Sequence, residues 1–483
     1  MTGFVLRGQH GVSVRFSDIL KGEGLRSRAL RGTAITLGGT FGSQLMRLLS
    51  NLILTRLLFP EAFGLMALIQ TFMTALQMFS DIGIRVSIIQ NPRGEESDFL
   101  NTAWTLQIFR GMVLWLVACA LAWPLASFYD EPQIRWLLPV VGLNAVVMGF
   151  LSTKMAVQNR RLRLGRQTVI SLVSQAGAVI LMVALAAVWP SVWALVIGGL
   201  FGNLMTVLAS HIYLPGAPSR LKWDRSAAHD LMKFGQFIFI STLAGFFVNQ
   251  GDKLVLGKLV SFTDLGIYNI AFFMAAFPTM LGRTVAERIL FPLYRHARPS
   301  ENPVNRHKIG RARNLVAGGM LAMFGTLALI GNLLIGLLYD VRYAAAGPML
   351  IIMALAQIPT ALTLGNSQLL LAEGDSRRFS RLVVLHAILN FILMLGGFWL
   401  LGMLGILLVQ GVQILIIYPL QQYYLSRYKG THLREDAVFA LAGVMIAAVA
   451  IWLNWGVLSA FCSTSVAAAP IQTGSWATVS LFH

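Results

Sequence analysis

Charged residues are scarce in this chain, and several kinds of functional motif are missing. Only 12% of its 483 residues are Asp, Glu, Lys or Arg, whereas a typical soluble domain has about a quarter. Its two cysteines, Cys119 and Cys462, offer neither a disulfide framework nor the spacing of a metal site. The chain has no H-E-x-x-H and no C-x-x-C motif, and Gly251–Lys258 lacks the spacing of a phosphate-binding loop. The sequence therefore argues against a soluble enzyme, a zinc protein or an ATPase.

Apolar residues take the place of the missing charges. They make up 56% of the chain, and the mean hydropathy is +0.68. Apolar stretches of about 20 residues, the length that spans a bilayer, recur from end to end. We expect thirteen spanning helices, at residues 33–54, 63–83, 104–127, 135–156, 167–189, 192–214, 233–253, 264–291, 314–338, 345–371, 382–401, 404–424 and 437–458. The tail after Leu458 is either a weak fourteenth span or a disordered end.

The net charge of +18 is distributed unevenly. Lys and Arg gather in the N-terminal tail and in alternate loops, such as 154–166 and 294–313, while the intervening loops have almost none. This positive-inside pattern places the N-terminus in the cytoplasm. The basic residues are therefore determinants of topology, with contact to anionic lipid as a further role. They do not indicate nucleic-acid binding.

An internal repeat divides the chain into two halves. Leu52–Leu65 matches Leu254–Ile267 at an offset of 202 residues, with Gly64 opposite Gly266. Chance similarity of two apolar hairpins is the alternative. Two parallel copies imply an all-α polytopic membrane protein with two pseudo-twofold related six-helix bundles and one or two extra C-terminal helices. The predicted domains are a cytoplasmic tail (1–32), helices 1–6 (33–214), a linker (215–232), helices 7–12 (233–424), and helix 13 with a weakly apolar tail (437–483).

Polar residues recur at helical spacing inside four of the predicted spans. One stripe contains Thr40, Gln44, Arg47 and Asn51, and the next contains Gln70, Thr74, Gln77 and Asp81. The equivalent helices of the second half carry Asn249 and Lys253, then Thr279, Arg283 and Glu287. An arginine at the bilayer centre costs at least about 2.5–3.5 kcal/mol, so it normally faces protein or water. We therefore predict one central cavity of net basic character.

A basic cavity selects an anionic cargo, because guanidinium groups bind phosphate oxygens in a bidentate fork. The predicted substrate contacts are Arg47, Arg283, Lys253, Gln44, Asn51, Gln77 and Asn249. Charge balance or ion coupling is assigned to Asp81, Asp252 and Glu287. In the alternative interpretation these charges are structural. Arg283 would then pair with Glu287, and Arg110 would snorkel to the interface. Asp252 would either pair with Lys253 or lie at the exterior interface. No catalytic residue, metal site or cofactor is predicted.

Several short runs resemble a known family. They are Arg56–Gly64, Phe79–Gly83 and Ile88–Gln90 in the first half, and Gln250–Lys253, Leu265–Tyr268 and Phe291–Pro292 in the second. These runs are similar to those of Wzx-type flippases, the polysaccharide exporters of the multidrug/oligosaccharidyl-lipid/polysaccharide superfamily. The resemblance covers about residues 30–425 and is greatest to colanic acid and succinoglycan exporters.

The resemblance implies a transporter rather than an enzyme. Members of that family move undecaprenyl-diphosphate-linked oligosaccharides to the periplasmic leaflet of the bacterial inner membrane by alternating access. Membrane lipids and other polysaccharide export proteins are then the expected partners, with no cofactor and no nucleic acid. An ion-coupled multidrug exporter of the same superfamily and a membrane polysaccharide polymerase or ligase are the alternatives. The short external loops, with almost no His or Arg, argue against the polymerase.

Overall fold

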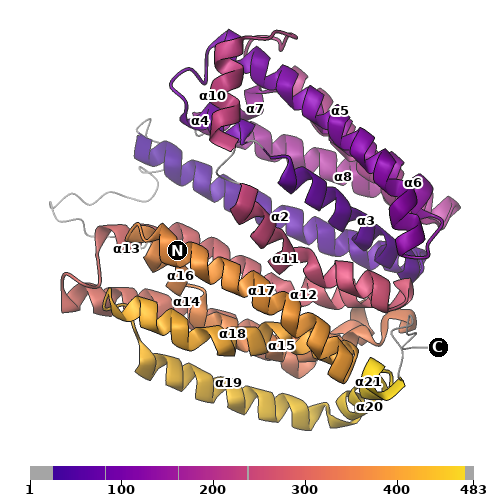
Figure 1. Cartoon of the computed structure of the whole chain (residues 1–483), viewed down its shortest axis with the longest axis vertical. Helices are drawn as coiled ribbons and strands as arrows, with labels where there is room; N and C mark the ends of the chain where they lie inside the picture. Colours follow the sequence, from indigo (N-terminus) through magenta and orange to yellow (C-terminus); the bar gives the residue numbers. More distant parts are fainter. Residues whose placement is uncertain (1–24, 82, 162, 236–238, 474–483) are drawn as a thin grey trace, which may run out of the picture. The chain divides into compact units, whose positions relative to one another are not determined.

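The computed structural model describes residues 25–473 without 82, 162 and 236–238, and this part of the chain consists of helices joined by loops (Figure 1). Side chains of residues 25–37, 230, 232–244, 248, 249, 288 and 472–473 are also outside the description. The described residues form no β-strand, which confirms the all-α prediction. They divide into two compact units, and helix α3 (Pro60–Phe79) contributes to both.

The first unit contains Met1–Leu58 and Phe72–Phe239. Its long helices pack α5 on α6, α8 on α9, and α2 on α8. Gly198 and Gly202 of α9 approach the backbone of α8 closely, so their GxxxG spacing serves helix packing. The helices of this unit are α2 (Leu25–Leu57), α4 (Ile84–Gln90), α5 (Ser97–Phe128), α6 (Ile134–Gly149), α7 (Lys154–Arg160), α8 (Gly165–Val188), α9 (Val192–Ile212) and α10 (Arg225–Gly235).

The second unit contains Phe59–Thr71 and Ile240–His483. Within it α14 packs on α15, α17 on α18, and α15 on both α12 and α18. Its helices are α11 (Phe239–Leu259), α12 (Phe262–Val285), the π-helical turn η1 (Ala286–Leu290), α13 (Phe291–His296), α14 (Pro303–Leu338), the 3-10 turn η2 (Val341–Tyr343), α15 (Ala346–Thr363), α16 (Asn366–Ala372), α17 (Ser376–Leu401), α18 (Met403–Ser426), α19 (Leu433–Leu453), α20 (Trp455–Ala467) and α21 (Pro470–Thr473).

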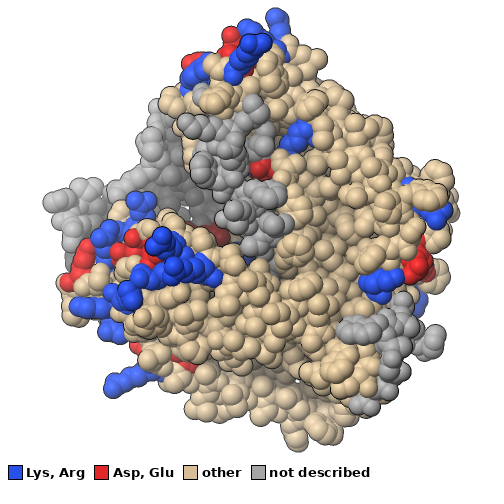
Figure 2. Space-filling view, in the orientation of Figure 1, with Lys and Arg blue, Asp and Glu red and all other residues tan. Residues whose placement is uncertain are grey.

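Ten helices among the described residues are long and apolar enough to cross a membrane, and an eleventh is formed if α6 and α7, bent by 60°, make one broken span. The two other predicted spans lie in α2 and α11, where polar residues lower the hydropathy. Figure 2 shows Lys and Arg side chains gathered in patches, with wide uncharged surface between them. The uncharged surface is the kind that hydrocarbon covers.

Some boundaries differ from the predicted spans. Helix α3 ends at Phe79 rather than residue 83, because Asp81 Oδ1 accepts from the backbone N–H of Gly83 at 2.9 Å and Gly83 has φ +67°. An Asx turn followed by a left-handed glycine stops a helix. Beyond α19 the tail continues as α20, a helix of 13 residues. At 1.5 Å per residue α20 is about 20 Å long, which is too short for a full span.

The glycines matched by the repeat face each other within the second unit. A methyl group on Gly64 would lie 1.9 Å from the carbonyl oxygen of Phe262, and one on Gly266 would lie 1.9 Å from that of Pro60. Pro60 and Phe262 are themselves separated by the repeat offset of 202 residues. The contact is therefore the same seen from either copy, as a twofold axis requires.

Candidate functional site

A polar cluster in the second unit joins α3, α11 and α12 around Lys253. The Lys253 ammonium donates to Oε1 of Gln250 at 3.1 Å and lies 5.1 Å from the ring centroid of Phe272. Thr71 Oγ1 donates to the same Gln250 oxygen at 3.4 Å. An amide and an aromatic face therefore hold this half-buried cation. Among the described residues, Gln250 is the one hydrogen-bond acceptor found for the three ammonium donors of Lys253, a cation that suits an anionic ligand.

Asp252, next in sequence to Lys253, has a different partner. Its Oδ2 accepts a short hydrogen bond from the hydroxyl of Tyr268, a buried residue whose ring stacks on Phe272 at 5.9 Å. None of the ion pairs found among the described residues joins Asp252 to Lys253. The structural pairing considered from the sequence is therefore not observed, and the role of Asp252 in charge balance stays a prediction.

The polar residues predicted on one face of α12 have different environments: the first is hydrogen-bonded to α15, and the others are exposed. Thr279 Oγ1 donates to Gln357 Oε1 of α15 at 2.6 Å, and the Gln357 amide donates back to the carbonyl of Ala275 at 3.2 Å. Arg283 and Glu287 are exposed, and no ion pair between them is found in the described structure. Glu287 lies in the π-helical turn η1, whose wider turn disturbs the i, i+4 alignment with Arg283. The side chain of Asn249 lies outside the described residues.

In the first unit the predicted residues lie on α2 and at the end of α3. Arg47 is exposed, and Gln44 and Asn51 are half-buried on the same helix. Ser43, beside this stripe, donates to Gln175 Oε1 at 2.6 Å and so ties α2 to α8. Gln77 is exposed near the end of α3, and Asp81 lies just beyond it in the Asx turn. The predicted site residues of α2 and of the end of α3 belong to the first unit and those of α11 and α12 to the second, so a shared cavity stays a prediction.

Arg110 of α5 forms hydrogen bonds with the end of α3. Its Nε donates to Ser80 Oγ at 3.0 Å, and its Nη2 donates to the carbonyl of Gln77 at 2.6 Å. A cation bound to the last carbonyls of a helix also complements the helix dipole. Arg110 of α5 therefore fixes the end of α3, a structural role consistent with the non-transport interpretation of this charge.

A buried polar network joins α14, α18 and α19, and it was not predicted from the sequence. Arg313 and Asp436 form an ion pair with each residue only 3% exposed, and Arg313 Nη2 also donates to the carbonyl of Leu362 at 2.8 Å. Tyr418 and Gln422 donate to the other carboxylate oxygen at 2.6 and 3.1 Å. The available signal was Asn302–Pro303, a helix start that places Arg313 inside α14 rather than in the loop.

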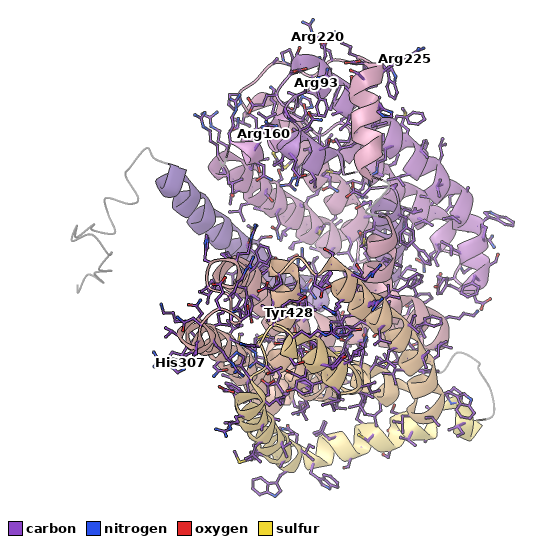
Figure 3. All side chains as sticks on the ribbon, turned by 60° about the vertical axis from the view of Figure 1, so that its left-hand side comes forward. Arg93, Arg160, Arg220, Arg225, His307 and Tyr428 are labelled. Atoms are coloured by element: carbon purple, nitrogen blue, oxygen red, sulfur yellow. The ribbon has the colours of Figure 1, made fainter. Side chains whose placement is uncertain are left out.

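Most basic residues at one end of the first unit have structural partners. Arg93, Arg160, Arg220 and Arg225 gather there (Figure 3). Arg93 bridges Glu96 at 2.9 Å and Asp224 at 3.4 Å, while Arg160 Nη1 donates to the carbonyl of Ile88 at 2.9 Å. Arg161 hydrogen-bonds to Glu95 and holds the pKa of that carboxyl below its ordinary value. These contacts fix α4, α7 and α10 together. The basic residues of these loops therefore help to pack the helices, in addition to their expected role in setting the membrane topology.

The described residues contain no group of three or more His, Cys, Asp or Glu side chains that could hold a metal ion. The arrangement offers cations, amides and hydroxyls, which bind polar or anionic groups by charge and hydrogen bonding.

A family model described as polysaccharide biosynthesis protein matches residues 53–348, more than half of the chain. The succinoglycan biosynthesis transport protein ExoT of Rhizobium meliloti is 23% identical over 66% of this chain and 63% of its own length. The amylovoran biosynthesis protein AmsL of Erwinia amylovora is 25% identical over 53% and 66%. The lipopolysaccharide biosynthesis protein WzxC of Escherichia coli is 22% identical over 50% and 49%. The matched segment thus spans about half to two thirds of the length of these relatives.

Two solved structures show the fold of this chain in other proteins. The lipid II flippase MurJ in an inward closed conformation has a TM-score of 0.69 at 14% identity, over 87% of this chain and 93% of that one. An inward-facing MATE-family multidrug resistance transporter has a TM-score of 0.58 at 12% identity, over 80% and 96%. The fold is therefore that of a multi-pass membrane protein with two pseudo-symmetric helical bundles, which confirms the predicted fold class.

Proposed function

The chain belongs to the polysaccharide biosynthesis protein family, and on that premise we propose that it is a flippase for undecaprenyl-diphosphate-linked oligosaccharides in the bacterial inner membrane. The family match is the observation that carries the proposal. The fold supports it, since one solved protein of this fold is the lipid II flippase MurJ. Units delivered to the periplasmic leaflet would serve exopolysaccharide or lipopolysaccharide synthesis.

The chemistry of the candidate residues fits an anionic headgroup. Lys253 makes one hydrogen bond, to Gln250, among the described residues, and Arg47 and Arg283 are exposed cations of their helices. Guanidinium groups keep their charge in a low dielectric and match the oxygens of a diphosphate. Gln44, Asn51, Gln77 and Asn249 would hydrogen-bond the sugars, and Asp81, Asp252 and Glu287 would balance charge or bind a coupling ion.

The orientation is proposed from charge. The segments 154–166 and 294–313 are rich in Lys and Arg, and positive loops stay in the cytoplasm. The N-terminus then lies in the cytoplasm, and alternating access opens the site first to that side. Other polysaccharide export proteins are the natural partners of such a step.

A multidrug exporter is the second candidate, because a MATE-family transporter has the same fold. Such an exporter would move organic cations, which the basic candidate residues would repel. A polysaccharide polymerase or ligase is a weaker candidate. ExoT, one of the relatives, is named a transport protein.

The test uses a strain that lacks this gene. We expect completed lipid-linked repeat units to accumulate and to be protected, in intact spheroplasts, from a membrane-impermeant oxidant of sugars. The wild-type chain should restore export. Arg47→Ala at equal expression should fail to restore export. Arg220→Ala, which removes an exposed loop arginine, should restore export like the wild type. Repeat units that are accessible to the oxidant but unpolymerised would overturn the proposal and favour the enzyme.

A further inference from the structure

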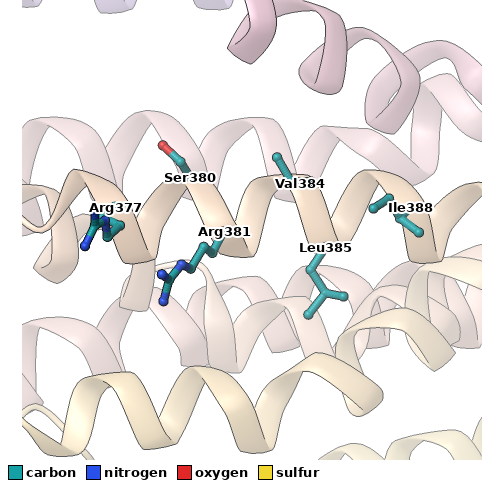
Figure 4. Close-up of a pocket in the computed structure, with 6 residues that line it drawn as sticks. All are labelled: Arg377, Ser380, Arg381, Val384, Leu385 and Ile388. Atoms are coloured by element: carbon teal, nitrogen blue, oxygen red, sulfur yellow. The ribbon is translucent and has the colours of Figure 1, made fainter.

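A groove of about 480 Å³ follows one face of α17 in the second unit. It is lined by Arg377, Ser380, Arg381, Val384, Leu385 and Ile388. Figure 4 shows the polar residues at one end of the helix segment and the apolar residues at the other. Such a gradient along a spanning helix matches the order of headgroup and hydrocarbon in one leaflet.

The two arginines at the polar end have no carboxylate partner among the described residues, although an acid lies close in sequence. Asp375 caps α17 by accepting from the backbone N–H of Arg378 at 3.1 Å. Its other oxygen binds the Arg378 guanidinium and the Tyr428 hydroxyl. Arg378 is therefore neutralised, while Arg377 and Arg381 are exposed on the groove one turn apart.

The groove as a whole, from its first arginine to its last apolar residue, is about as long as one leaflet is thick. From Arg377 to Ile388 the helix rises roughly 16 Å at 1.5 Å per residue. This rise is close to the thickness of one leaflet's hydrocarbon, which is half of a core of about 30 Å. Val384 and Ile388 are 42% and 53% exposed, and the apolar face continues through Phe391 and Ile392.

We propose that this groove binds an anionic glycerophospholipid of the leaflet in which α17 begins. The phosphate lies between the guanidinium groups of Arg377 and Arg381, which can each donate two parallel hydrogen bonds to its oxygens. One acyl chain lies along Val384, Leu385 and Ile388. The groove offers a single uncharged polar side chain, Ser380, beyond its arginines. A glycan-bearing carrier lipid would need more polar contacts, so an ordinary bilayer lipid is the better match.

The site is independent of the proposed transport activity, and binding can be measured directly. Purified full-length protein in neutral detergent is titrated with dioleoyl phosphatidylglycerol and followed by native mass spectrometry. Each arginine near a membrane surface contributes roughly a fivefold gain in affinity, so Arg377→Ala/Arg381→Ala should bind about thirtyfold more weakly. Arg377→Lys/Arg381→Lys keeps the charges without the fork and should lose only severalfold.

The matched control is Arg295→Ala/Arg311→Ala, which removes two exposed arginines of α13 and α14 outside the groove and should bind like the wild type. Equal losses in control and groove variants would show mere charge attraction and overturn the site. Wild-type binding of phosphatidylcholine as tight as that of phosphatidylglycerol would also overturn it. Tenfold tighter binding of polyprenyl diphosphate than of phosphatidylglycerol would overturn the proposal and assign the groove to the carrier lipid instead. Inorganic phosphate that competes as well as phosphatidylglycerol would also overturn it, because phosphate has no acyl chain.

Discussion

At the scale of single residues, the ion pair of Arg313 and Asp436 makes the stability of the second unit depend on a buried charge. Removing one partner of such a pair leaves an uncompensated charge and costs about 3–5 kcal/mol. We expect Asp436→Asn to lower the melting temperature of the detergent-purified protein clearly. Arg313→Met/Asp436→Leu should recover most of the loss, because no charge is left buried. Melting of Asp436→Asn at the wild-type temperature would contradict the role of the pair.

His432, beside this pair, makes the same region sensitive to acid. Burial and the guanidinium of Arg313 lower its pKa from the ordinary 6.5, with Arg306 acting in the same sense and Glu435 and Asp436 opposing. The unfolded chain therefore takes up a proton at a higher pH than the folded protein. Stability should be full above about pH 6.5 and fall as the pH drops below it. Melting curves between pH 7.5 and 5.5 test this, and His432→Gln should show a smaller decrease. An unchanged pH dependence in that variant would contradict the prediction.

The candidate site was only partly predictable at this scale. Helical spacing placed Lys253 and Arg283 on polar faces, because periodicity reports which side of a helix a residue occupies. The partners come from other helices and leave no local signal. The hydrogen bonds of Gln250 to Thr71 and of Asp252 to Tyr268 join residues 179 and 16 positions apart. The pair of Arg313 and Asp436 was missed for the same reason, since 123 residues separate its members.

At the scale of helices, the crossing of α3 and α12 depends on two glycines. A side chain at Gly64 would collide with the backbone of Phe262, which cannot yield as a flexible side chain would. We therefore expect Gly64→Ala and Gly266→Ala each to lower thermal stability in detergent. Gly319→Ala in α14 is the control, because no atom lies within 4 Å of the added methyl group. It should be neutral or stabilising by up to about 1 kcal/mol. If the crossing and control variants melt alike, the close approach does not stabilise the fold.

Most helix positions were predictable because long apolar segments cross a bilayer as helices, which pair all their backbone polar groups internally. Each of the thirteen expected segments overlaps at least one helix of the described structure. The ends of the helices depended on local turns and bends. The Asx turn at Asp81 ended α3 early, and a 60° bend separates α6 from α7 within a segment predicted as one. Hydropathy does not register side-chain caps or bends, so these boundaries required the structure.

At the scale of the whole molecule, the proposed orientation makes a directly testable prediction. The chain's two natural cysteines allow a background of Cys119→Ser/Cys462→Ser, into which one cysteine is returned at a time. Gln133, exposed between α5 and α6, should lie outside, and Ser300, exposed between α13 and α14, should lie in the cytoplasm. A membrane-impermeant thiol reagent should then label Gln133→Cys in intact spheroplasts but Ser300→Cys only after lysis. The reverse pattern would place the basic loops outside. It would contradict a flippase that takes its substrate from the cytoplasmic leaflet, because the site would then face the wrong compartment at the loading step.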